Sequence, residues 1–192
     1  MDEMKSAFER ALERAERMGK LSPEEMQRQN EAKYVPAGEA IAQRFFEHGQ
    51  ISILAEQLDK LENEGKSIAT RSALATLISS IDLENKDLAE RALEGIIGLQ
   101  GSKTVADVAD EVMKFFGQHS WQKKLWYEEN SEEMGKEAKE RMATAGIDGN
   151  AIAGINIENN EEWAKKADEI RSEFDARLSE MKQALGRSFD SE

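Results

Sequence analysis

Cysteine is absent from the 192-residue chain, and its absence excludes several kinds of site. Without a thiol the protein has no disulfide bond, no thiolate zinc site, no iron–sulfur cluster and no cysteine nucleophile. A chain of this length can bury enough surface to fold without such cross-links. The absence of disulfides also fits a reducing compartment, and we expect the protein to be cytoplasmic.

Long apolar runs are missing as well. No segment approaches the roughly 20 apolar residues that a membrane-spanning helix requires. The N-terminal sequence MDEMKSAFERALERAERMGK is charged throughout and lacks the apolar region of a signal peptide. We therefore expect a soluble, intracellular protein without a membrane partner.

Positive charge is in short supply. The chain has 26 lysine and arginine residues but 39 aspartate and glutamate residues, which gives a formal net charge of -13. Basic residues cluster only as pairs, Lys123 with Lys124 and Lys165 with Lys166, and each pair lies close to carboxylates. Because nucleic-acid affinity comes largely from cations that displace counterions from phosphates, the sequence argues against a nucleic-acid partner.

Proline occurs only twice, and apolar residues recur at steps of three and four along most of the chain. This is the period of a helix rather than of a strand. The pattern predicts an all-α fold, a multi-helix bundle of about seven to eight helices with a long C-terminal helix. One short extended segment is expected near residues 150–157.

Several residues mark the expected helix ends. Ser22 followed by Pro23 predicts a helix start, because serine caps free amides and proline suits the first helical position. Val35 before Pro36 predicts a boundary, because the residue before proline is pushed out of the α conformation. Gly49 and Gly65 are expected to end the next two helices. The remaining helices of this part are expected over about residues 4–18, 67–81, 84–98 and 104–116, with 67–81 as the central buried helix.

After His119 the chain becomes strongly charged, with one thin apolar stripe in each segment. The stripe from Trp163 to Leu185 predicts a final helix of about 27 residues, roughly 40 Å long. We therefore divide the chain into a helical core domain, residues 1–120, and an extended helical arm or hairpin, residues 121–192. A narrow stripe needs a partner surface, which is either another part of this chain or a second copy of it.

The stretch AGIDGNAIAGIN, residues 145–156, has the glycine content of a ligand-binding loop. Gly149 and Gly154 have the spacing of a phosphate loop, but Ile155 and Asn156 stand where that loop needs lysine and a hydroxyl. A calcium loop fails too, because its twelfth position is Asn159 rather than a bidentate glutamate. The sequence therefore predicts no metal and no cofactor here.

A turn followed by an extended segment accounts better for this stretch. Gly146 is expected to cap the preceding helix. Ile152, Ile155 and Ile157 are β-branched and favour an extended backbone, which would lie on the core or pair with another strand. Pairing with the same segment of a second subunit, or with a peptide, would make it an interface.

Only two histidines occur, His48 and His119, and neither belongs to a metal-binding motif. His48 is expected at the C-terminus of a helix, where its charged form would interact favourably with the helix dipole. His119 precedes Ser120, but no G-x-S-x-G elbow surrounds this serine. Paired carboxylates are spread over the whole chain and single out no acid–base pair. The sequence favours a non-enzymatic role over an enzyme.

Two segments resemble a family of uncharacterised bacterial helical proteins. They are MKSAFERALERAERMGKLSPEEMQRQNEAKYVPAGEAIAQRFF near the N-terminus and GIDGNAIAGINIENNEEW before the last helix. The resemblance implies a domain of unknown function in a bacterial cytoplasm. It implies no activity and no catalytic residue.

The aromatic group Trp121, Trp126 and Tyr127 cannot all lie on one helix face, so at least one large ring is expected off the apolar stripe. These rings either close over the core or form an interface. Our candidate interface residues are Trp121, Trp126, Tyr127, Ile152, Ile155, Ile157, Trp163, Ile170, Phe174 and Met181.

The leading functional hypothesis is a helical protein–protein interaction or scaffold protein that acts as a homo-oligomer. The alternative is an enzyme or a small-ligand or metal-binding protein with a carboxylate-lined pocket between helices.

Overall fold

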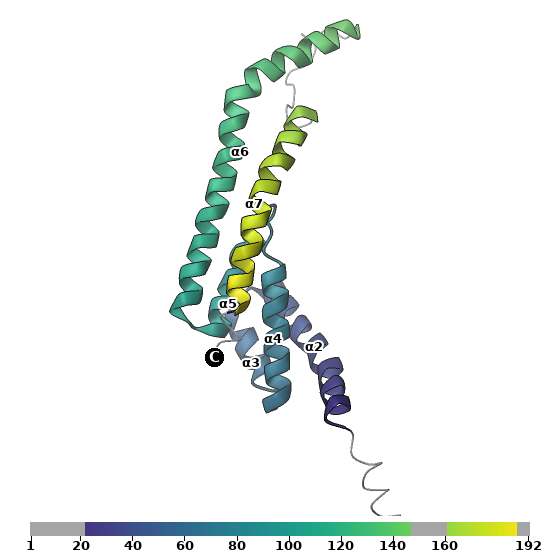
Figure 1. Ribbon diagram of the computed structural model, residues 1–192, viewed down its shortest axis with the longest axis vertical. Helices are drawn as coiled ribbons and strands as arrows, with labels where there is room; N and C mark the ends of the chain where they lie inside the picture. The colour runs from purple at the N-terminus through teal and green to yellow at the C-terminus, as the bar shows by residue number, and fades with distance from the viewer. Residues whose placement is uncertain (1–21, 147–160, 188–192) are drawn as a thin grey trace, which may run out of the picture. The chain divides into compact units, whose positions relative to one another are not determined.

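The computed structural model of the protein describes residues 22–146 and 161–187 (Figure 1). Within these residues the chain forms six α-helices and no strand, which confirms the all-α prediction. The helix expected over residues 4–18 and the extended segment expected near 150–157 lie outside the described residues. The described residues form slightly fewer helices than the seven to eight expected for the chain, because α2 and α6 each continue past an expected boundary.

The chain divides into two compact units, residues 1–73 and residues 74–192. The described part of the first unit contains α2 (Pro23–His48), α3 (Ile51–Leu58) and most of α4 (Asn63–Ser79). The second contains the end of α4, α5 (Lys86–Gln100), α6 (Lys103–Thr144) and α7 (Glu161–Arg187). Because α6 runs across residue 120, no helix boundary marks the predicted division there, and that division stays a prediction.

α2 begins as the sequence predicts. The Ser22 hydroxyl accepts a hydrogen bond from the Glu25 amide at 3.2 Å, and the Glu25 carboxylate accepts one from the Ser22 amide at 2.9 Å. This reciprocal pair is a capping box. Gly49 follows the helix with a positive φ of 67°, and His48 lies in the last turn, both as expected.

The helix boundary expected at Val35 and Pro36 is wrong, because α2 continues through Pro36. A proline inside a helix removes one backbone hydrogen bond and crowds the preceding turn. Within the same unit, the Ser72 hydroxyl on α4 donates a hydrogen bond to the Val35 carbonyl at 2.8 Å. We attribute the continuous helix to this contact with α4, which no local sequence pattern reveals.

Two glycines let α2 and α4 approach closely. A Cβ atom at Gly38 would overlap the backbone of Ala69 and lie 2.8 Å from the Cβ atom of Ser72. A Cβ atom at Gly65 would overlap the ring of Tyr34. Gly65 therefore lies inside α4 and does not end α3, contrary to the sequence prediction; α3 ends at Leu58. A close helix contact, rather than a turn, explains both glycines.

α5 and α6 follow with short connections. The Asn85 side chain accepts a hydrogen bond from the Leu88 amide at 3.0 Å and so caps α5. α6 was expected to end near residue 116, but it has 42 residues and ends at Thr144. In the outer part of α6, which follows His119, pairs of opposite charge one turn apart stabilise the helix, for example Lys136 and Glu132 at 2.9 Å. Gly146, which was expected to cap this helix, follows its C-terminus with a positive φ of 77°.

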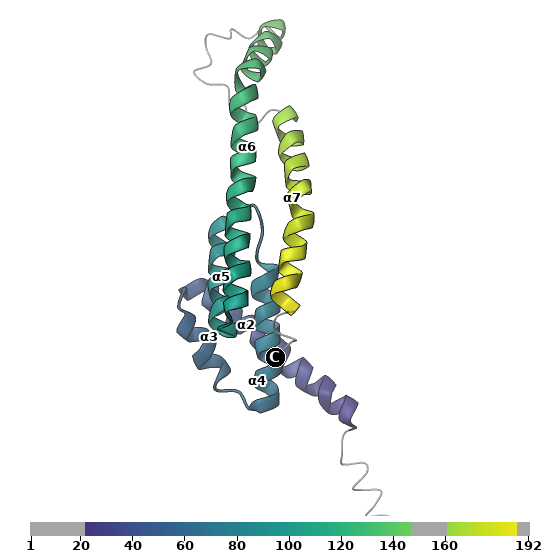
Figure 2. The same ribbon diagram turned by 60° about the vertical axis from the view of Figure 1, so that its left-hand side comes forward.

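α7 has 27 residues, which confirms the long C-terminal helix. It runs beside α6 in the opposite direction (Figures 1 and 2). The antiparallel register follows from two ring contacts, since Phe115 meets Phe174 at 4.7 Å and Trp126 meets Trp163 at 5.6 Å between ring centroids.

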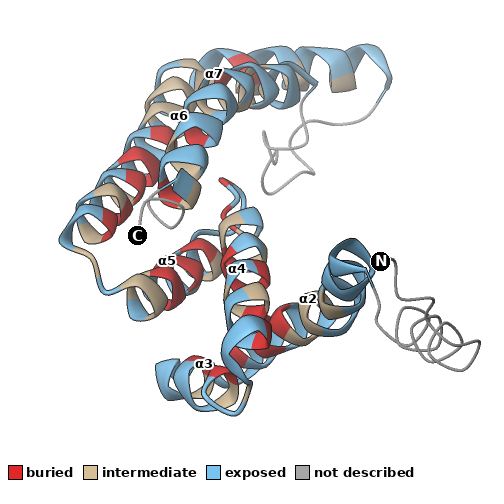
Figure 3. Ribbon diagram, turned by 60° about the horizontal axis from the view of Figure 1, so that its bottom comes forward, coloured by how far each residue is buried: buried red, intermediate tan, exposed pale blue. Residues whose placement is uncertain are grey.

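Burial along α6 is uneven (Figure 3). Its first half carries six buried residues, Val105, Ala109, Val112, Phe115, Phe116 and His119. Beyond His119 the only buried residue of the helix is Met134. None of the described helices is both long enough and apolar enough to cross a membrane.

Candidate functional site

The described candidate interface residues differ in how far they are buried. Ile152, Ile155 and Ile157 lie outside the described residues. Ile170 is buried and Met181 is half-buried on α7. The ring of Phe174 is packed against Phe115 and His119. The described candidates on α7 thus contribute mainly to the packing of this helix.

Trp126 and Tyr127 on α6 enclose the ring of Trp163 on α7. The Trp126 and Trp163 rings are 5.6 Å apart and tilted, whereas Tyr127 meets Trp163 edge-on at 5.4 Å. Such tilted and edge-on pairs are favourable because the edge of one ring faces the negative face of another. This aromatic cluster holds the outer parts of α6 and α7 together.

Trp121 is the exception, since it remains 64% exposed. His119, two residues earlier, is buried against α7. At about 100° per residue, a two-residue step places Trp121 on the opposite side of α6. Within the described part of the unit this large aromatic side chain therefore remains in solvent, and little of its apolar surface is buried to stabilise the fold.

His119 is a polar residue in an apolar position. It is 3% exposed, and its ring lies 5.2 Å from that of Phe174. No described residue forms a hydrogen bond with its buried Nε2 atom. Burial lowers the pKa of His119 below its ordinary value, and the positive charge of Lys123 lowers it further. Its ring is therefore neutral at pH 7.

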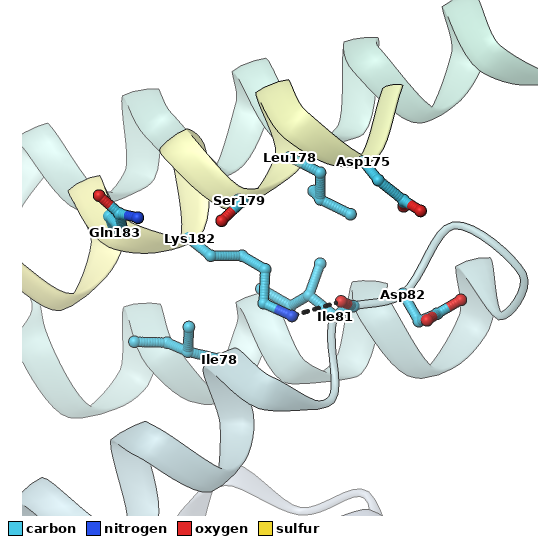
Figure 4. A pocket seen from close by; sticks show the side chains of 8 residues that line it. All are labelled: Ile78, Ile81, Asp82, Asp175, Leu178, Ser179, Lys182 and Gln183. Carbon is cyan, nitrogen blue, oxygen red and sulfur yellow. Dashed lines mark hydrogen bonds between the residues drawn. The ribbon is translucent and has the colours of Figure 1, made fainter. Parts of the chain in front are cut away.

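A cleft of about 360 Å³ lies between α7 and the C-terminal end of α4, within the second unit (Figure 4). Its apolar lining comes from Ile78, Ile81 and Leu178, and its polar groups come from Asp82, Asp175, Ser179, Lys182 and Gln183. The cleft is open to solvent along its length, so a ligand there would remain partly hydrated.

Lys182 crosses this cleft and caps α4. Its ammonium group donates hydrogen bonds to the carbonyl oxygens of Ser79 at 3.2 Å and Ile81 at 2.9 Å. Carbonyls at a helix C-terminus lack partners and carry partial negative charge, so a cation is favourable there. The lysine thereby attaches α7 to the end of α4.

Arg171 occupies the neighbouring position on α7. Its guanidinium lies 3.8 Å from the carboxylates of Asp82 and Glu84 and 3.6 Å from that of Asp175. All four side chains are substantially exposed, so each pair contributes little to stability. The two carboxylates that line the cleft are thus already near a cation of the protein itself.

Sequence reasoning missed this cleft. Its residues come from segments about one hundred positions apart, and no motif connects them. Among the described residues, no three histidine or acidic side chains are arranged to hold a metal ion. The cleft can offer hydrogen bonds and weak charge contacts to a ligand, but it has no nucleophile paired with a base.

The geometry of the described residues defines an all-helical protein whose second unit contains an antiparallel helix pair with one exposed tryptophan. The chain belongs to a family of unknown function, DUF6657, whose model matches residues 55–187. The match includes α4 to α7, Trp121, His119 and the cleft. Of the two segments that carry the resemblance, the glycine-containing one lies inside the match and the N-terminal one outside it. No curated protein and no solved structure matches the chain.

Proposed function

We propose that the protein is a cytoplasmic, bacterial interaction or scaffold protein that acts as a homo-oligomer through the outer part of α6 and α7. One observation carries the proposal: Trp121 is 64% exposed, whereas the nearby Trp126 and Tyr127 pack on α7. Tryptophan is among the residues most enriched at the energetic centres of protein interfaces.

The thin packing of the same region supports the proposal. After His119, α6 continues for another 25 residues, from Ser120 to Thr144, and buries only Met134. A helix in a protein gains most of its stability from an apolar face packed on another surface, because an isolated helix is only marginally stable in water. A partner on the outer face of α6 would supply such a surface.

Sedimentation velocity over a concentration series tests this proposal. We expect assemblies of at least two chains at tens of micromolar, and a shift toward monomer for Trp121→Ala. Ile51→Ala is the matched control, because Ile51 is also an exposed apolar residue, at 45%, but lies on α3. A compact monomer at high micromolar concentration would contradict the proposal.

The cleft beside Lys182 favours the alternative, a small-ligand or metal-binding protein with a carboxylate-lined pocket. Asp82 and Asp175 line it, together with the Lys182 ammonium group. A ligand that binds only the folded protein raises its melting temperature. The alternative predicts such an increase for at least one metal ion or metabolite in a broad panel, and Asp175→Asn should abolish it. If no compound raises the melting temperature, the cleft is only a surface feature.

A further inference from the structure

The outer face of α6 has a composition that fits a second copy of itself. This face contains Lys114, Gly117, Trp121, Leu125 and Glu128, and it is exposed apart from Leu125, which is half-buried. At about 100° per residue, these positions stay on one side of the helix and opposite to the face that carries His119. They lie in the middle of α6.

Gly117 leaves room on this face for a close neighbour. It lies inside a helix, where glycine is less favourable than alanine by about 0.5–1 kcal/mol. A Cβ atom there would meet no other heavy atom within 4 Å, so no neighbour in the described structure requires a glycine at this position. In the same protein, Gly38 and Gly65 lie where another helix approaches closely.

We propose that two copies of the chain associate through antiparallel α6 helices, with the two-fold axis at Trp121. The inference rests on the proposed homo-oligomeric function and names its partner surface. In this arrangement residue 121+k of one helix lies at the level of residue 121−k of the other. Leu125 of each copy therefore reaches the level of Gly117 of the other, where no side chain obstructs it.

Two charged residues on this face, Lys114 and Glu128, fit the same arrangement. Lys114 of each copy lies at the level of Glu128 of the other, and the two-fold axis generates this pair twice. Among the described residues, Glu128 pairs with the exposed Lys124, at 3.6 Å. A parallel pairing would instead place Lys114 against Lys114 and Glu128 against Glu128, which is unfavourable. The two Trp121 rings meet at the centre, where water is best excluded.

Cross-linking tests this register directly, because the chain has no cysteine of its own. A mixture of Lys114→Cys and Glu128→Cys chains, treated with a short bis-maleimide, should yield a covalent heterodimer, identified by its intact mass. Each variant alone should yield little dimer, since identical residues would lie about 21 Å apart along the pair. The matched control replaces Glu128→Cys with Glu132→Cys, which shifts the thiol by one helical turn.

Charge exchange provides a second test. Lys114→Glu and Glu128→Lys alone should each weaken self-association, by about fivefold. The double variant should restore it, because it recreates both pairs in reverse.

The outcomes separate the register from the proposed function. Efficient self-cross-linking of either single variant would overturn the antiparallel arrangement. A higher yield with Glu132→Cys than with Glu128→Cys would overturn the position of the axis. Oligomers that form through another surface, unaffected by Trp121→Ala, would overturn the inference but keep a homo-oligomeric function. A monomer at all concentrations would overturn both.

Discussion

His119 combines a titratable ring with a buried and largely aromatic environment. Phe174 on α7 covers it, and the charged groups that face it are Lys123 on its own helix, Glu84 before α5, and Asp175 and Arg171 on α7. The carboxylates favour the charged ring, but burial outweighs them, so the pKa of His119 is lower in the folded protein. The unfolded chain has no such penalty, and its histidine keeps the ordinary pKa near 6.5.

This difference predicts a loss of stability in acid. As the pH falls below about 6.5, His119 becomes protonated in the unfolded chain but stays neutral in the folded protein. The free energy of unfolding therefore decreases until the pH reaches the pKa of His119 in the folded protein. His119→Gln removes this titration. Urea unfolding at about pH 7.5 and about pH 5.5 should therefore show a smaller decrease for the variant than for the wild type. Equal decreases would contradict the role given to His119.

At the scale of the helix, the contact between α2 and α4 depends on the absence of side chains. Gly38 and Gly65 allow a distance at which the Ser72 hydroxyl reaches the Val35 carbonyl. Helix propensity alone would disfavour both glycines and Pro36. Tertiary packing offsets these local costs, which is why α2 remains one helix.

Gly38→Ala should therefore destabilise the protein, by about 1–3 kcal/mol, because the new methyl group would overlap the backbone of Ala69. Gly135→Ala is the matched control within α6, where a Cβ atom would meet no other heavy atom within 4 Å. This control should be stabilising by about 0.5–1 kcal/mol, because alanine is the better helix former. Thermal or urea unfolding measures both changes. If Gly38→Ala is as stable as the wild type, the close contact is wrong.

At the scale of the whole molecule, a formal charge of -13 acts against any self-association. Two such chains repel each other over a distance set by the ionic strength, about 30 Å at 0.01 M salt and about 8 Å at 0.15 M. The ion pairs proposed at the α6 face act over shorter distances and are exposed.

Salt should therefore strengthen the proposed self-association by a few fold between about 0.01 M and 0.15 M, as measured by sedimentation. Duplex DNA or RNA would show the reverse dependence, and we expect no binding to either even at low salt. The charge-exchanged double variant, Lys114→Glu with Glu128→Lys, has the same net charge and should follow the same trend. Weaker association at higher salt would mean that attraction between charged groups dominates the interface.

The features that the sequence alone determined are those whose causes lie within a few residues. The apolar period gives helices, Ser22 and Glu25 cap one another across three positions, and Gly49 and Gly146 end helices by their own left-handed conformation. The charge and the absence of cysteine likewise follow from composition. Each of these depends on local geometry or on a simple count, so no fold is needed to predict them.

Only the tertiary structure decided the features that require a partner from elsewhere in the chain. Pro36 and Gly65 have the local pattern of breaks, yet contacts between α2 and α4 keep both inside helices. The sequence predicted that at least one of the three candidate aromatics lies off the apolar stripe, but the structure decided which: Trp126 and Tyr127 pack on α7, and Trp121 is exposed. Lys182 reaches the end of α4 across about one hundred residues of sequence. Packing energy at such sites exceeds local preference, and it depends on which surfaces the folded chain brings together.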